Sequence, residues 1–206
     1  MRYRIFSFRN AQTIFENDQQ FSHLWEEVKD TLNSISDQDI IESYNDNNRK
    51  SKKSISDDIN RLIDQRLVQL NWNRQSAIFN DSIYRPQGRN HWWTLDFAKE
   101  SIAIEVAFNH GEATAWNLIK PVLSSELNHV EKAIQTHAGI IITATDSMKT
   151  AGNFDNSCGS YEKFLQYLDP FRNILTVPMN IIGLEAPETF RINSTSKTVE
   201  YISKWI

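Results

Sequence analysis

The chain has 206 residues, of which 40% are hydrophobic, and a formal net charge of −4. This length suits one α/β domain, residues 1–206, and the hydrophobic content excludes a disordered chain. No apolar run reaches the roughly 20 residues that cross a bilayer, so we expect no membrane segment, and no apolar segment follows the charged N-terminus as in a signal peptide. The charge balance does not itself indicate nucleic-acid binding, which would require the cations to gather on one face.

The only cysteine, Cys158, permits no internal disulfide and is typical of a protein in a reducing cytoplasm. Cationic side chains form three clusters, each of which is also compatible with ordinary solvated surface. The clusters are Arg2, Arg4 and Arg9; Arg49, Lys50, Lys52 and Lys53; and Arg85 and Arg89.

In the N-terminal part, residues 1–10 predict a β-strand or an arm, because apolar side chains alternate with arginines. From Phe21 to Ile35 the apolar residues recur at intervals of three and four, which predicts an amphipathic helix. Residues 36–55 are the least apolar stretch and predict a loop. Its basic part at 44–54 is either mobile until it contacts a polyanion or a solvated linker.

A second helix is predicted from Ser54 or Ser56, either of which can cap it, to Leu70. Loop and strand follow at 72–83. The next stretch predicts two β-runs, Trp92 to Phe97 and Ile102 to Phe108, joined by a charged turn.

In the C-terminal half, residues 112–137 predict one long helix with a broad apolar face, broken or kinked at Pro121. The β-branched run 139–145 predicts a buried parallel strand, and the long polar loop 146–160 suggests a functional role. A short helix at 161–168 and a last core strand within 174–184 complete the pattern. This order predicts a mixed sheet flanked by helices, with its acids at one sheet edge.

The second β-run places Glu105 between Ala103 and Ala107 on one face, behind which lies an apolar face. A tight turn would bring Asp96 close to it. Mg²⁺ takes oxygen ligands and needs few carboxylates, so the two acids, with the carbonyl of Val106, are candidate ligands of a magnesium site. Alternatively, Asp96 is a turn residue, and Glu105 pairs with Lys99 or a distant arginine.

This arrangement, an aspartate followed nine residues later by Glu105-Val106-x-Phe108, resembles the core of the PD-(D/E)xK nucleases. More closely, it resembles the type II restriction endonucleases of the BglII- and BstYI-like group, and more distantly BamHI. Further segments over most of the chain match this group: Leu24-Trp25-Glu26-Glu27; Ser125-Glu126-Leu127 with His129; Ile140 to Thr143, then Asn156-Ser157 and Tyr161-Glu162; and Val177-Pro178 with Ile182-Gly183-Leu184.

The resemblance implies a restriction-endonuclease-like α/β fold, with a mixed central sheet flanked by helices. It implies Mg²⁺-dependent hydrolysis of phosphodiester bonds at a short palindromic site in double-stranded DNA, with Asp96 and Glu105 as metal ligands and no organic cofactor. It also implies a homodimer with one catalytic centre per strand, in which the helix at 112–137 contributes to the interface unless it packs only on its own sheet. Such a restriction-modification enzyme is expected in the cytoplasm of a bacterium or archaeon.

Position 107 departs from the family pattern, because the group has Gln or Glu there, and the wider superfamily has Lys. Ala107 can neither take a proton nor hold a cation. Three explanations follow: an engineered inactive variant, which we prefer; another residue in the role, such as Glu112 or Glu126; or a protein that binds DNA without cleaving it. A repair or recombination nuclease on the same core is a further alternative.

Contacts with base edges require amide and hydroxyl groups on a rigid rim. The candidates are Asn109, His110, Asn156 and Ser157, of which the Asn-Ser pair matches base-reading residues of the family. His110 would otherwise only bond backbone. Lys149 and Arg191 are candidates for contacts with phosphate or guanine, or else are surface cations.

Overall fold

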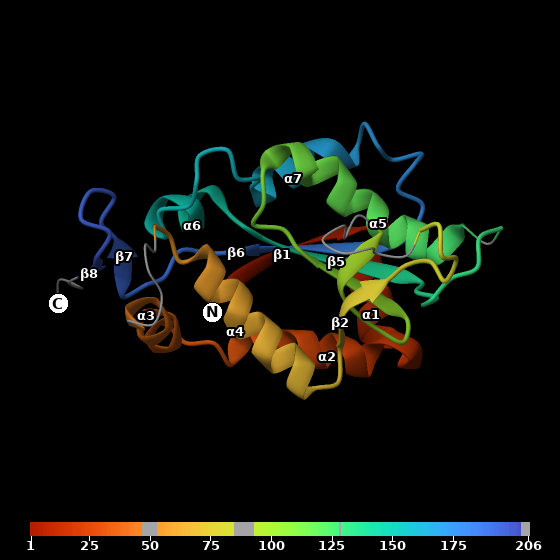
Figure 1. The fold of residues 1–206 in the computed structure, drawn as a ribbon, viewed down its shortest axis with the longest axis horizontal. Coiled ribbons are helices and arrows are strands. Elements are labelled where there is room, and N and C mark those ends of the chain that lie inside the picture. The colour runs from red at the N-terminus through yellow and green to blue at the C-terminus, as the bar shows by residue number, and fades with distance from the viewer. Residues whose placement is uncertain (47–52, 85–92, 128, 203–206) are drawn as a thin grey trace.

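The computed structural model describes residues 1–46, 53–84, 93–127 and 129–202. Two of the predicted basic clusters lie largely or wholly outside this part of the chain, as does the start of the first predicted β-run at Trp92. Figure 1 shows a central sheet with helices on both sides.

Six strands form the sheet, in the order β1-β6-β5-β4-β3-β2. Strands β4, β5 and β6 are parallel. The other pairs are antiparallel: β1 with β6, β2 with β3, and β3 with β4. The predicted mixed sheet is therefore confirmed. The strands are β1 (Tyr3–Phe8), β2 (Asn73–Ala77), β3 (Thr94–Lys99), β4 (Ile102–Val106), β5 (Ala138–Ala144) and β6 (Met179–Leu184).

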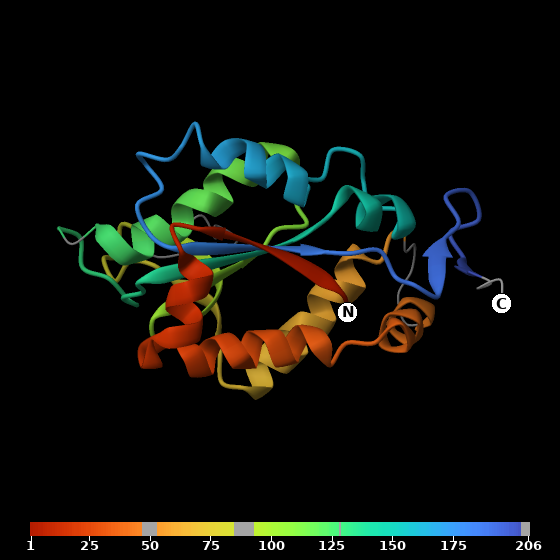
Figure 2. The same ribbon diagram turned by 180° about the vertical axis from the view of Figure 1, so that it is seen from behind.

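The helices divide between the two faces of the sheet (Figure 1). Below it in that view lie α1 (Ala11–Asn17), α2 (Gln19–Asn33), α3 (Asp37–Asn45) and α4 (Ser56–Gln69). Above it lie α5 (Thr114–Glu126), entered through a 3₁₀ turn at Gly111–Ala113, α6 (Asp146–Ala151) and α7 (Tyr161–Leu168). A small hairpin, β7 (Phe190–Ile192) with β8 (Val199–Tyr201), lies at one end, which Figure 2 shows from behind.

The alternation predicted for β4 is confirmed by the two cores. Ile102, Ile104 and Val106 belong to the apolar core that also contains the buried side chains of α2 and α4. Ala107, directly after the strand, belongs to the core that contains Leu118 of α5. Glu105 therefore projects from a fully buried strand toward the helix α5.

Residues 36–55 are not one loop, because they contain helix α3. The side chain of Ser36 accepts the backbone N–H of Asp39, and Asp39 in turn accepts the backbone N–H of Ser36, so a capping box starts the helix. Of the predicted basic loop at 44–54, residues 44 and 45 end this helix. Residues 47–52 lie outside the described part of the chain.

The prediction of one long helix at 112–137 is also wrong, because α5 ends at Glu126. Pro121 lies inside the helix and does not end it. The returning chain supplies donors to its last carbonyls: Gln135 Nε2 donates to the Ser125 carbonyl at 2.6 Å, and the Thr136 N–H to the Ser124 carbonyl at 3.2 Å. These bonds satisfy two of the carbonyl groups that a helix end leaves without intrahelical donors, which favours the end of α5 at this point.

Two smaller expectations need correction. The polar stretch 146–160 begins with α6, because the Thr145 hydroxyl accepts the Met148 N–H as an N-cap. The central hairpin does not lie at the sheet edge, since β2 covers β3 on its outer side. No helix among the described residues is both long enough and apolar enough to cross a membrane.

Candidate functional site

Asp96 on β3 and Glu105 on β4 come together, as the sequence predicted. Phe97 pairs with Ile104 in the antiparallel ladder, so Asp96 and Glu105 are the next residues along it. Oδ2 of Asp96 accepts the backbone N–H of Val106 at 2.8 Å, and Oδ1 accepts Gln75 Nε2 at 3.3 Å. Asp96 is therefore not a turn residue. The chain reverses at Glu100, whose φ of 47° is left-handed.

Glu105 is buried, with 1% of its surface exposed. Burial raises the pKa of its carboxyl well above the ordinary value, and the Asp96 charge raises that pKa further, while the ammonium group of Lys120 lowers it. Oε2 of Glu105 contacts that ammonium group. Oε1 is buried without a hydrogen-bond partner among the described residues. An unsatisfied buried oxygen of this kind is costly, so it needs a partner that the described residues do not supply, such as a water molecule or an ion.

Lys120 was not among the residues that the sequence singled out. Its ammonium group reaches Glu105 from α5 and also donates to the Thr94 carbonyl at 3.1 Å. Lys99, the partner predicted as an alternative, instead pairs with Glu27 of α2 at 2.7 Å. The one available signal was a lysine among the apolar residues of a helix that follows an acidic strand, because lysines are rarely buried without a partner.

Ala107 offers only its backbone to polar neighbours. Its N–H donates to the Ile142 carbonyl at 2.8 Å, and its carbonyl accepts the Thr143 hydroxyl at 3.0 Å. Glu112 and Glu126, the predicted replacements, are both exposed. Within the described residues, neither makes a hydrogen bond or ion pair with Asp96 or Glu105.

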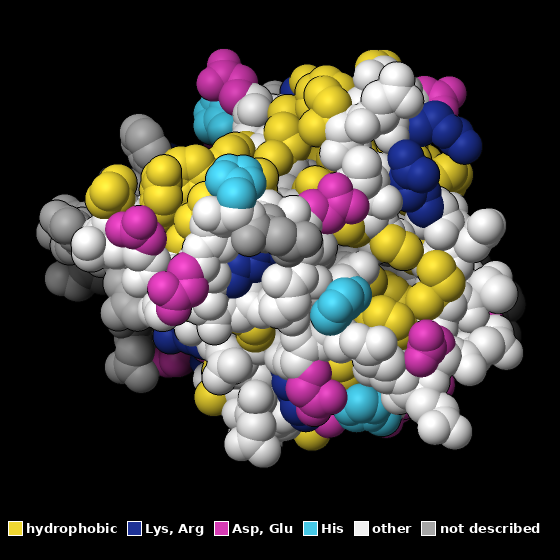
Figure 3. All heavy atoms as spheres, turned by 90° about the vertical axis from the view of Figure 1, so that its right-hand side faces the viewer, with side chains coloured by type: hydrophobic (Ala, Val, Ile, Leu, Met, Phe, Trp, Pro, Cys, Tyr) yellow, Lys and Arg dark blue, Asp and Glu magenta, His cyan; other side chains and the backbone are white. Residues whose placement is uncertain are grey.

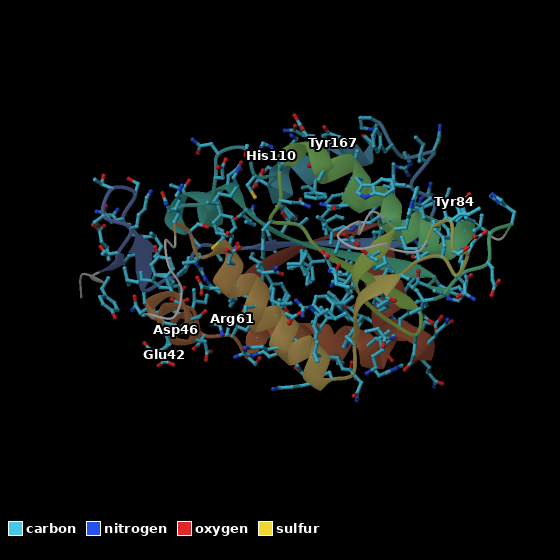
Figure 4. The ribbon with its side chains drawn as sticks, viewed as in Figure 1. Glu42, Asp46, Arg61, Tyr84, His110 and Tyr167 are labelled. Carbon is cyan, nitrogen blue, oxygen red and sulfur yellow. The ribbon has the colours of Figure 1, made fainter. Side chains whose placement is uncertain are left out.

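The predicted polar rim forms beside the end of β4, and Figure 4 labels His110 there. His110 Nε2 lies 2.9 Å from the Ser157 hydroxyl, which itself donates to Asp155 Oδ1 at 2.6 Å. The hydroxyl oxygen is therefore the acceptor, and His110 carries its proton on Nε2. Asn109 is held by Asn117 of α5, whose amide donates to Asn109 Oδ1 at 3.1 Å. The sequence had not indicated Asp155, whose pKa is lowered by its hydrogen bonds from Ser157.

Lys149 and Asn156 line a hollow of about 440 Å³ at α6, together with Ser194 of the β7–β8 hairpin. The ammonium group of Lys149 donates to the Cys158 carbonyl at 2.5 Å, so it ties the loop at 152–160 to helix α6. Arg191 makes its ion pair within its own hairpin, where its Nε lies 2.9 Å from Glu200 Oε2.

The donors at Asp96 and Glu105 fit a hard divalent cation. They are oxygen atoms, one of them unpartnered, and the two negative charges repel each other. Across residues 1–46, 53–84, 93–127 and 129–202, no three His, Cys, Asp or Glu side chains gather as a metal site. A cation here would therefore be held by two carboxylates, with backbone carbonyls such as that of Val106 and water completing its shell.

The chain is similar to proteins of known family and fold. The family model for the restriction endonuclease BglII/BglIII matches residues 3–184. No curated protein gives a significant sequence match. The chain is similar to the crystal structure of restriction endonuclease BglII complexed with a DNA 16-mer, with a TM-score of 0.66 and 22% identity over 97% of this chain and 87% of that one. It is also similar to free BglII, with a TM-score of 0.55 and 20% identity over 98% and 91% of the two chains.

The solved structures establish the fold, and the family model, which spans most of the chain, establishes the family. The chain therefore belongs to the BglII/BglIII restriction endonucleases, a family of type II site-specific deoxyribonucleases.

Proposed function

We propose that the protein hydrolyses phosphodiester bonds at a short palindromic site in double-stranded DNA, with Mg²⁺ as its cofactor and Asp96, Glu105 and the Val106 carbonyl as the metal ligands. The observation that carries the proposal is the unpartnered Oε1 of Glu105 beside the ordered carboxylate of Asp96. A buried acid that a half-buried one repels is unfavourable for folding alone, which argues that the two acids are kept for a cation.

When bound, Mg²⁺ would neutralise charge at the phosphate and make a water molecule more nucleophilic. The chain's own residues prepare that site. The Val106 N–H fixes Asp96, so that its carboxylate is ordered in advance. Helix α5 covers Glu105 and excludes water from one side, which strengthens every electrostatic interaction of that carboxylate.

We further propose that the polar rim reads the bases. The backbone N–H of Gly111 donates to the Ser157 carbonyl at 2.7 Å, and the Gly159 N–H to the Asn109 carbonyl at 3.1 Å, so the two segments that carry the rim residues are tied to each other. Rigid polar groups of this kind are what major-groove recognition needs. BglII has been crystallised with a DNA 16-mer, and its fold is shared by this chain.

The rim candidates then take different roles. Asn109, His110, Asn156 and Ser157 contact base edges, whereas Lys149 and Arg191 contact phosphate or guanine. Arg191 would first have to leave Glu200, and because Arg191 is exposed this ion pair is weak.

We propose a homodimer that uses α5, because a palindrome presents two equivalent strands. Leu118 is buried in the single chain, whereas Trp116, Ile119, Val122 and Leu123 are only half-buried. Figure 3 shows hydrophobic side chains gathered along the upper part of the end of the molecule toward which α5 runs. A second copy would remove this surface from water.

Ala107 leaves three alternatives for activity. The chain is a cleavage-impaired variant that still binds its site, or another group supplies what position 107 lacks, or the protein binds DNA without cleaving it. Incubation of duplex DNA with Mg²⁺, using the unsubstituted chain, Ala107→Gln and Ala107→Glu, separates them. Cleavage only by the substituted chains supports the first alternative, cleavage by the unsubstituted chain supports the second, and binding without cleavage by any of the three supports the third.

The nuclease proposal itself is tested by selecting bound sequences from a random duplex pool and digesting the selected site. We expect a palindrome, cut in both strands, with cleavage lost in Asp96→Asn and Glu105→Gln. Binding to branched DNA in preference to any fixed sequence would contradict the restriction function and favour a repair nuclease.

A further inference from the structure

The side chain of Lys120 lies at the centre of the candidate site although it comes from a helix and not from the catalytic hairpin. It is 9% exposed, and its ammonium group contacts Glu105 Oε2 and the Thr94 carbonyl. Within the described residues, no other Lys, Arg or His forms an ion pair with Asp96 or Glu105. Lys120 is therefore the positively charged side chain at the site of the two acids.

Position 107 and Lys120 are related by the geometry of the sheet. Ala107 follows Glu105 by two residues, so it lies on the same side of the hairpin, the side that α5 covers. Position 107, directly after strand β4, supplies no polar side chain on that side. Helix α5 supplies one from above, directed at the same carboxylate.

A second helix-to-sheet ion pair shows what a purely structural pair looks like in this protein. Lys99 donates to both oxygens of Glu27, at 2.7 and 2.8 Å, and to the Leu70 carbonyl at 2.9 Å, while Trp72 Nε1 donates to Glu27 Oε2. Both oxygens of that glutamate are satisfied. The Lys120 pair differs, because it engages one oxygen of Glu105 and leaves the other without a partner.

Stability alone is a weak reason for such a pair. Taking two charges out of water offsets most of their attraction, and apolar replacements of buried ion pairs are often neutral. An incomplete pair is less favourable still, since its free oxygen is desolvated without compensation. The arrangement makes sense when the unpartnered oxygen has a ligand during function.

We propose that Lys120 is the positioning residue that replaces the missing group at position 107: it holds Oε2 of Glu105, leaves Oε1 directed to the cation, and supplies positive charge beside the scissile phosphate. This inference rests on the proposed nuclease function and extends it. It assigns to α5 a role that the family pattern gives to the strand.

The first test measures DNA binding without any divalent cation, in EDTA, on the selected duplex. Lys120→Met removes the positive charge that the proposal places beside the phosphate, so we expect binding to weaken about tenfold. In the double variant Lys120→Met/Glu105→Gln that charge is still missing, so the affinity should stay within about threefold of that of the single variant. Lys99→Met is the matched control and should bind as the natural chain does.

The second test titrates Mg²⁺ alone into the DNA-free protein and compares the affinity with the single-turnover cleavage rate at saturating Mg²⁺. In Lys120→Met the loss of a neighbouring positive charge should tighten Mg²⁺ binding by about 3- to 10-fold, while the cleavage rate falls by about 100-fold or more. A structural defect would weaken both. Lys120→Arg keeps the charge, and we expect it to retain cleavage within about tenfold of the natural rate.

The outcomes separate this inference from the proposed function. If Lys120→Met binds in EDTA and cleaves like the natural chain, Lys120 is a structural residue and the inference is wrong. If Ala107→Gln cleaves and the unsubstituted chain does not, the inference is again wrong, but the nuclease function stands. If no chain, substituted or not, binds a duplex site, the proposed function itself fails.

Discussion

The carboxylate of Asp96 accepts the backbone N–H of Val106 at 2.8 Å, so the acid on one strand of the hairpin orders the backbone next to the acid on the other. This bond joins the two proposed metal ligands into one rigid unit before any cation arrives. Preordered groups of this kind lose little freedom when the ligand binds, which favours both affinity and catalysis.

Asp96→Asn should separate the structural role of this residue from its chemical one. The amide oxygen can still accept the Val106 N–H, so we expect a thermal midpoint within a few degrees of the natural protein. Cleavage should fall by about 100-fold or more, because a neutral amide is a poor Mg²⁺ ligand. Asp64→Asn is a matched control, since Asp64 pairs with exposed Arg74 at 2.7 Å, away from the site. Equal loss of cleavage in both variants would contradict the assignment.

Ser157→Ala should relax sequence discrimination more than it weakens binding overall. Ser157 orients His110 and lies between it and Asp155, so its loss frees the ring and removes a hydroxyl from the rim. We expect discrimination between the selected site and its single-base variants to fall by about 1–3 kcal/mol. Competition binding measures this, with Ser22→Ala on helix α2 as the control. Uniform weakening at every sequence would instead indicate a phosphate contact.

Val122→Glu should convert the proposed dimer into a monomer. Val122 is half-buried on α5, and a charge there would be desolvated in an interface formed by that helix. Sedimentation at micromolar concentration measures the change, and circular dichroism checks the fold. Val68→Glu is the control, since Val68 is 45% exposed on α4, on the other side of the sheet. A natural chain that sediments as a monomer in the presence of its DNA site would overturn the dimer.

Ser36→Ala should destabilise the protein by about 1 kcal/mol, because the capping box at the start of α3 loses its acceptor for the Asp39 N–H. Chemical denaturation at pH 7 measures this effect. Thr13→Ala in helix α1, whose N-terminus has no side-chain cap, should cost less. A change no larger than that of Thr13→Ala would contradict a stabilising cap.

The same cap gives stability a dependence on pH. The Ser36 backbone N–H and hydroxyl hold the pKa of the Asp39 carboxyl below its ordinary value, so the native state favours the charged form. Stability from this group is therefore complete above the unfolded pKa, near 4, and is lost as the pH falls through the folded pKa. In Asp39→Asn the drop in stability between pH 5 and pH 2 should be smaller than in the natural chain, as measured by thermal unfolding. An identical drop would exclude Asp39 as a source.

Local pattern was sufficient wherever one face of an element is apolar. The alternation from Ile102 to Val106 predicted both the strand and the side that Glu105 faces, and the helix at Tyr161–Leu168 was predicted with its observed bounds. Pattern failed at α3, where the capping box at Ser36 outweighed a polar composition. It failed also at the end of α5, where Gln135 and Thr136 return to bond the last carbonyls.

The sequence by itself determined the hairpin, the pairing of Asp96 with Glu105 and the absence of a polar side chain at position 107, because spacing of two along a strand dictates which side chains share a face. Only the tertiary structure decided what lies above them. Lys120 follows Glu105 by fifteen residues, on a different element, and its approach depends on how α5 packs across β3 and β4. Contacts between elements are set by packing over the whole core, so no local pattern contains them.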